Sequence, residues 1–240
     1  MATNSTALSC PMGCRPSKLF DPTNDVERAA LELLRHHFAP AGTDIGFDGN
    51  SWMKAFETRE VFCKQFSWAI PSDVALAKIA SCGPIIEIGA GTGFWSAMLT
   101  ARGADVIAFD QAPLPETMPE TVCDLLTSEA DADAAINPWH VGQNTKGPVM
   151  RGSVAEASLH PDRALMLCWP PYSTNFAYDA LVDYAGDTVV YIGEYSGGCC
   201  GTDEFFTLLH ETFDEVDTVD IPQWPGIHDV LTIWKRKAAP

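Results

Sequence analysis

The stretch that decides the fold is "PIIEIGAGTGFW", residues 84–95. Its first half is a short apolar run interrupted by Glu87, which is typical of a buried parallel strand. Glycines then stand at alternate positions (Gly89, Gly91 and Gly93) before a segment with helical character. Glycine adopts positive φ at little steric cost, and a helix N-terminus offers free N–H groups to a ligand. The stretch therefore predicts a ligand-binding turn between a strand and a helix.

The spacing around this turn narrows the kind of ligand. A dinucleotide-binding turn of the form G-x-G-x-x-G would need a glycine where Phe94 stands, and a P-loop would need a Gly-Lys-Ser/Thr sequence that is missing. The next expected strand, "ADVIAFD", ends at Asp110. An acid at that position can accept hydrogen bonds from both hydroxyls of a ribose. The order Glu87, glycine turn, Asp110 favours a cofactor site over a purely structural strand–helix corner.

The remaining pattern predicts an α/β fold. The chain has 240 residues, of which 46% are hydrophobic and 20% charged, so a large core can form. We expect a doubly wound, mostly parallel seven-stranded sheet with an antiparallel edge hairpin and an N-terminal helical cap. The division is residues 1–83 for a tail and the cap, and 84–240 for a Rossmann-like catalytic domain. The expected strands are 84–89, 104–110, 148–153, 163–169, 187–194, 214–221 and 228–235, and the expected helices are 24–38, 51–66, 70–80, 92–103, 174–186 and 203–213, with a helical patch near 119–136.

Over residues 84–235 the sequence resembles the class I S-adenosylmethionine-dependent methyltransferases, whose first motif is an acid followed by G-x-G-x-G. The resemblance implies S-adenosylmethionine as the cofactor and direct methyl transfer as the reaction. It implies that Glu87 and the three glycines face the methionine part and that Asp110 binds the ribose. By the same resemblance, Ser153 and Val154 lie beside the adenine.

A second stretch, "LCWPPYST" at 167–174, shows where the methyl acceptor is expected. Its two prolines must end the preceding strand, because proline has no N–H to donate. "WPPY" is similar to the fourth motif of amino-directed methyltransferases, which implies that Tyr172 stacks on the acceptor and that carbonyls of Cys168 and Pro170 face it. Trp169 takes the place of that motif's polar residue, and its indole face attracts a cationic amine. The alternative is a strand terminator with core aromatics.

Other residues are expected on the same rim of the sheet. Glu194 ends the fifth strand, where a carboxylate can hold an ammonium group or take a proton. We expect Glu194, Tyr172 and Trp169 to be the catalytic candidates, and a structural role is the alternative for Glu194. The acceptor-binding candidates are Trp169, Pro170, Tyr172, Glu194, His140, Trp224 and His228. The segment "FSWAIPS" is expected to bring Trp68 over the cofactor as part of a lid.

The charge and the cysteine content limit which partners and which cellular compartment are expected. There are 32 acidic and 15 basic residues, so the net charge of −17 opposes binding to nucleic acid. No signal peptide or membrane-spanning stretch is recognisable, and eight scattered cysteines favour reduced thiols, so we expect a cytoplasmic protein with no membrane partner. "CPMGC" at 10–14 lacks two further ligands, so no metal site is expected.

These observations together predict an S-adenosylmethionine-dependent methyltransferase that acts on a small-molecule acceptor, with nitrogen as the favoured atom. Two alternatives stay open. The Pro-Pro-Tyr similarity allows a nucleic-acid amino-methyltransferase, which the charge disfavours. The chain could also be a non-catalytic cofactor-binding scaffold, with residues 111–148 serving as an interface to another subunit.

Overall fold

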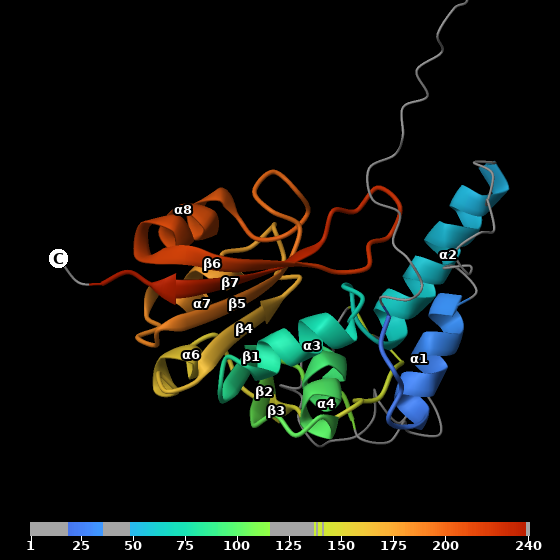
Figure 1. The fold of residues 1–240 in the computed structure, drawn as a ribbon, viewed down its shortest axis with the longest axis horizontal. Coiled ribbons are helices and arrows are strands. Elements are labelled where there is room, and N and C mark those ends of the chain that lie inside the picture. The colour runs from blue at the N-terminus through green and yellow to red at the C-terminus, as the bar shows by residue number, and fades with distance from the viewer. Residues whose placement is uncertain (1–18, 36–48, 116–136, 138, 141, 239–240) are drawn as a thin grey trace, which may run out of the picture.

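The computed structural model describes residues 19–35, 49–115, 137, 139–140 and 142–238 (Figure 1). Within them, one seven-stranded sheet has the order β3-β2-β1-β4-β5-β7-β6. The strands from β3 to β5 pair in parallel, whereas β7 is antiparallel to both of its neighbours. The predicted fold class is therefore confirmed, including the antiparallel hairpin at one edge. The strands are β1 (Ile85–Ile88), β2 (Val106–Asp110), β3 (Met150–Arg151), β4 (Ala164–Cys168), β5 (Thr188–Gly193), β6 (Phe213–Asp220) and β7 (Val230–Arg236).

Helices cover both faces of the sheet, and Figure 1 shows α8 on the face opposite α3 and α4. Side chains alternate between the faces along each strand, so Ile85 packs with α3 and α4 while Ile86 packs with α7 and α8. The central strands β1, β4 and β5 are thus buried on both sides, which accounts for their nearly continuous apolar sequences. The helices are α1 (Asp25–Arg35), α2 (Gly49–Gln65), α3 (Asp73–Ala80), α4 (Phe94–Ala101), α6 (Glu156–Leu159), α7 (Phe176–Val182) and α8 (Asp203–Thr212).

Of the N-terminal helices, α1 and α2 lie beyond the end of the sheet, whereas α3 packs on a face of the sheet with α4. Helix α3 begins as expected, because the Ser72 side chain accepts a hydrogen bond from the N–H of Ala75. Helices α1 and α2 lie at the end of the sheet toward which the β6–β7 loop extends (Figure 1). Since β7 runs antiparallel, its start lies at the same rim as the carboxyl ends of the parallel strands. Helices α1 and α2 therefore face the rim where an open α/β sheet binds ligands.

Two details differ from the sequence expectations, and two expected features cannot be compared. The short helix α6 was not expected, and β3 is reduced to two residues. The helical patch predicted near 119–136 lies entirely outside the described residues, as does "CPMGC". No helix in the described part of the chain is long and apolar enough to cross a membrane.

Candidate active site

The glycine turn has the backbone conformation that its sequence predicts. Gly89, Gly91 and Gly93 have φ values of 76°, 56° and 71°, and Gly93 caps the N-terminus of α4. The Asp110 carboxylate accepts hydrogen bonds from the N–H of Gly91 and the N–H of Ala112, each at 2.9 Å. Asp110 thus ties the turn to the end of β2, in addition to the ribose contact that the resemblance implies.

Glu87 lies buried at the start of this turn. Its side chain is 2% exposed, and its Oε2 atom has no hydrogen-bond partner. Desolvation raises the pKa of the carboxyl to about 8, although hydrogen bonds from Ser96 act in the opposite direction. A buried polar atom without a partner calls for an explanation, and a ligand that donates hydrogen bonds is one. Glu87 therefore has a carboxyl oxygen without a partner beside the glycines.

Side chains of the protein lie over all three glycines. A Cβ added at Gly89 would be 2.7 Å from Cζ of Phe176, one at Gly91 would be 2.8 Å from Nε2 of His140, and one at Gly93 would be 2.7 Å from Cγ2 of Val149. A cofactor lying on the turn requires Phe176 and His140 to turn away or to contact it.

His140 is therefore placed at the cofactor turn, although the sequence assigned it to the acceptor. It is 4% exposed, and its Nδ1 lies 2.9 Å from the carbonyl oxygen of Lys64. A carbonyl only accepts hydrogen bonds, so Nδ1 carries the proton. Desolvation lowers the pKa of the imidazole, which leaves Nε2 unprotonated and facing Gly91.

The two residues expected beside the adenine lie just after β3. Ser153 is exposed, and its hydroxyl accepts a hydrogen bond from the N–H of Ala155. Val154 is half-buried and packs at the border of the α7–α8 side of the core. Their place next to β2 puts them on the side of Asp110, and their contact with an adenine stays a prediction.

Trp169 is the centre of an aromatic cluster at the end of β4. Its φ of 52° is the only positive value at a non-glycine residue in the described chain, and such strain persists only where surrounding contacts enforce it. The indole ring stacks on Trp68 with centroids 5.2 Å apart, and Trp139 meets Trp68 edge-on at 5.6 Å. The indole N–H donates to Oδ1 of Asp229 at 2.8 Å.

The rest of "WPPY" does not join this cluster. Tyr172 is 62% exposed, and no ring contact among the described residues involves it. Pro170 is buried, and its carbonyl accepts a hydrogen bond from the N–H of Gly201. Pro171 bridges to Cys200. The Pro170 carbonyl thus holds the loop after β5, and its contact with an acceptor stays a prediction.

Glu194 is also engaged by the protein itself. Its carboxylate accepts hydrogen bonds from the N–H of Cys199 at 2.9 Å and the N–H of His228 at 3.0 Å. Desolvation acts to raise the pKa of Glu194, but these backbone donors prevail and hold it below its usual value. Glu194 stays ionised and joins two loops at the rim, which favours the structural alternative over a general base.

Trp224 and His228, the two acceptor candidates between β6 and β7, differ in burial. Trp224 is 1% exposed and packs in the core against Phe62, with ring centroids 5.7 Å apart, so its assignment to an acceptor surface is wrong. The side chain of His228 is 81% exposed, and its Nδ1 lies 3.5 Å from Glu194. Of these two residues, only His228 remains at the rim.

Sequence reasoning missed Asp229, which is 0% exposed and whose Oδ2 has no partner. Burial raises its pKa to about 7, opposed by the Trp169 hydrogen bond and reinforced by Glu194. In the sequence, the feature that could have indicated Asp229 is an isolated acid directly before the apolar strand β7.

Sequence reasoning also missed Arg59 of α2, because an arginine within a helix has no sequence feature that marks it as part of a site. Its guanidinium carbon lies 5.4 Å from the centroid of Trp169.

No protein-family model matches this sequence, and no curated protein matches it significantly. Among solved structures, magnesium protoporphyrin IX methyltransferase from Synechocystis PCC 6803 is 12% identical over 86% of this chain and 90% of its own, with a TM-score of 0.42. 1,6-Didemethyltoxoflavin-N1-methyltransferase from Burkholderia thailandensis is 15% identical over 92% of this chain and 94% of its own, with a TM-score of 0.40. N-methyltransferase NodS from Bradyrhizobium japonicum WM9 is 14% identical over 69% of this chain and 94% of its own, with a TM-score of 0.38.

Similarity at this level does not establish an activity. The sheet order and the strand directions stand on the structure itself. By that topology the chain has the doubly wound Rossmann-like α/β fold that its resemblance to the class I methyltransferases predicted.

Proposed function

We propose that the chain is an S-adenosylmethionine-dependent methyltransferase that acts on a small molecule. The observation that carries the proposal is the unpartnered carboxyl oxygen of Glu87, buried beside a turn of positive-φ glycines and next to Asp110. A nucleoside cofactor with an amino-acid tail has the groups that these residues can bind: an ammonium for Glu87 and ribose hydroxyls for the free lone pairs of Asp110. When bound, the cofactor supplies a methyl group on a sulfonium.

The contribution of the chain is positioning and exclusion of water. The glycines let the cofactor contact the backbone, and Glu87 orients its ammonium end. The indole rings of Trp68, Trp139 and Trp169 form an apolar wall beside β4, where water competes poorly. Nitrogen as the accepting atom is supported by the similarity of "WPPY" to the amino-directed motif. The described cysteines are free thiols, which supports a reducing compartment such as the cytoplasm.

The test is binding of S-adenosylhomocysteine to the full chain by calorimetry, together with its effect on the melting temperature. We expect saturable binding and a rise in melting temperature, since a ligand of the native state stabilises it. Glu87→Gln keeps the shape of the side chain but not its charge, and should weaken binding at least tenfold. Glu204→Gln, in the first turn of α8, is the matched control and should bind normally.

Two results would contradict the proposal. One is no binding at millimolar S-adenosylhomocysteine by a folded protein. The other is equal affinity of Glu87→Gln and the unmodified chain. Methyl transfer to a mixture of small amines and acids, followed by mass spectrometry, then separates an enzyme from a scaffold that only binds the cofactor.

A further inference from the structure

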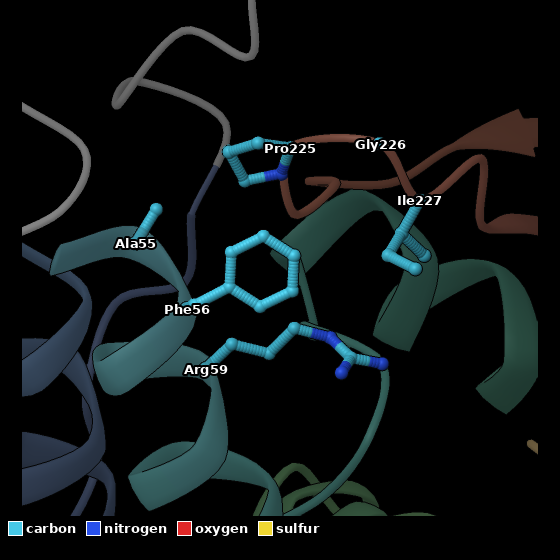
Figure 2. Close-up of a pocket in the computed structure, with 6 residues that line it drawn as sticks. All are labelled: Ala55, Phe56, Arg59, Pro225, Gly226 and Ile227. Atoms are coloured by element: carbon cyan, nitrogen blue, oxygen red, sulfur yellow. The ribbon is translucent and has the colours of Figure 1, made fainter. Parts of the chain in front are cut away.

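A pocket of about 170 Å³ lies between α2 and the β6–β7 loop (Figure 2). Its lining is Ala55, Phe56, Arg59, Pro225, Gly226 and Ile227. Figure 2 shows the Phe56 ring and the Arg59 side chain extending from α2 below the loop. A cavity of about 150 Å³ is enough for one benzene ring. The pocket therefore fits a ring-sized group, with apolar walls and a single cation.

The Arg59 guanidinium has no anionic partner in the described part of the chain. Its Nε is buried without a hydrogen-bond partner, and no described carboxylate forms an ion pair with it. Among the other described arginines, Arg102 pairs with Glu27 and Arg163 with Asp105, whereas Arg236 donates to backbone carbonyls. Although the chain has 32 acidic and 15 basic residues, Arg59 pairs with no carboxylate of the described ranges, so its guanidinium is open to an anionic ligand.

Asp229 does not take that role. The charge of Arg59 acts to lower the pKa of Asp229, but burial outweighs it and raises that pKa to about 7. The Oδ1 atom of Asp229 accepts the indole N–H of Trp169. The guanidinium instead lies over two indole faces, 5.3 Å from the centroid of Trp68 and 5.4 Å from that of Trp169. Such stacking orients a guanidinium and leaves its N–H edge free for a planar anion.

Helix α2 connects this pocket to the glycine turn. Near its C-terminal end, the carbonyl of Lys64 contacts His140, whose Nε2 lies over Gly91. The carbonyl of Phe66 accepts a hydrogen bond from the Thr92 hydroxyl. Arg59 precedes Lys64 by five residues, which is about 7.5 Å of helix. Helix α2 therefore sets the spacing between the pocket and the glycine turn.

We infer that the pocket binds the anionic end of the methyl acceptor, a flat carboxylic acid whose carboxylate pairs with Arg59. The opposite end of the acid, with a nucleophilic nitrogen or oxygen, points toward the glycine turn. This inference rests on the proposed function for the identity of the ligand as an acceptor. It replaces the expectation of a cationic acceptor, because the indole faces that would attract one already carry Arg59.

The experiment compares acids with their uncharged analogues on the full chain. Benzoate, phenylacetate and para-aminobenzoate are titrated beside benzamide, phenylacetamide and para-aminobenzamide, with and without saturating S-adenosylhomocysteine. We expect at least one acid to bind at least tenfold more tightly than its amide. Arg59→Met keeps the length and the apolar contact but not the charge, and should remove that preference. Arg59→Lys should retain part of it.

Arg28→Met is the matched control, because Arg28 pairs with Asp25 on the exposed side of α1, and it should keep the full preference for acids. The affinity for S-adenosylhomocysteine should change less than twofold in Arg59→Met. The inference is overturned if no acid binds better than its amide, or if the preference persists in a folded Arg59→Met variant. If the acids are preferred but S-adenosylhomocysteine does not bind, the anion pocket stands and the proposed function fails.

Discussion

At the scale of single residues, Glu87 should release a proton when the proposed cofactor binds. Its pKa of about 8 keeps most of the carboxyl protonated at pH 7. An ammonium group beside it favours the ionised form, so binding of S-adenosylhomocysteine should release close to one proton. Calorimetry in phosphate and in Tris measures this release, because the apparent enthalpy then varies with the ionisation enthalpy of the buffer. Glu87→Gln should remove the variation, and an enthalpy independent of buffer in the unmodified chain would argue against an ammonium at this carboxyl.

Asp229 should make the protein less stable as the pH rises. With its pKa near 7, its carboxyl is largely protonated in the folded state below about pH 7, whereas in the unfolded chain it ionises near its ordinary pKa of 3.8. The folded state therefore binds more protons between these values, and the free energy of unfolding falls by up to about 1.4 kcal/mol per pH unit. Glu87 acts in the same direction up to about pH 8, whereas His140, whose pKa is lowered, acts in the opposite direction below pH 6.5.

The comparison with Asp229→Asn isolates this group, because Glu87 and His140 are present in both proteins and Glu194 and Arg59 face the position in both. An asparagine oxygen can still accept the Trp169 N–H. We expect the variant to gain stability relative to the unmodified chain as the pH rises from 5 to 7. Urea unfolding at several pH values measures this, and a difference that does not change with pH would contradict it.

At the scale of elements, the end of β4 combines a packed and an exposed aromatic residue. Trp169→Ala removes the stacking on Trp68 and leaves Asp229 without its donor, so we expect a loss of about 3 kcal/mol. Tyr172→Ala, in the same turn, should change stability by less than about 0.5 kcal/mol because the ring is exposed. Urea unfolding of both variants checks the contrast. Equal losses would mean that Tyr172 is packed after all.

The attachment of the N-terminal helices to the sheet domain depends on the end of α4. Arg102 pairs with Glu27 of α1, which is 1% exposed, and with Asp73 at the start of α3. Arg102→Met leaves the Glu27 carboxylate buried without its cation, which should cost about 3 kcal/mol. Arg28→Met, which breaks the exposed pair with Asp25, should cost less than about 0.5 kcal/mol. Chemical unfolding of the two variants measures the difference, and similar costs would show that the Arg102 pair contributes little.

At the scale of the whole molecule, the acidic surface should exclude nucleic acid. The net charge of −17 repels a phosphate backbone, and the edge strand β6 carries four acidic residues of its own. We expect no binding of duplex DNA or RNA by fluorescence anisotropy at about 0.15 M salt, near-physiological conditions in which a specific binder would be retained. A submicromolar complex whose affinity falls steeply with salt would instead support the nucleic-acid amino-methyltransferase.

The sequence by itself determined the order of the elements and the cofactor turn. The apolar run before Gly89, the alternate glycines and Asp110 are local patterns, because strand period, positive φ and strand ends depend on neighbouring residues. The same holds for the Ser72 cap, which lies within one turn of its partner. The ends of the elements were predicted less well than their order. The two-residue strand β3 shows why, because its length depends on its pairing with β2.

Only the tertiary structure decided what the rim residues contact. Trp224 and His228 stand four residues apart, yet one is in the core and the other is exposed, because the path of the β6–β7 loop sets their burial. Glu194 finds its donors in two loops, and Arg59 meets Trp169 from 110 positions away along the chain. Partners so distant in sequence leave no periodic signal, since their meeting depends on how helices and loops pack over the sheet. The conformation of the glycine turn could therefore be predicted from the sequence, whereas the contacts of the rim residues could be found only in the tertiary structure.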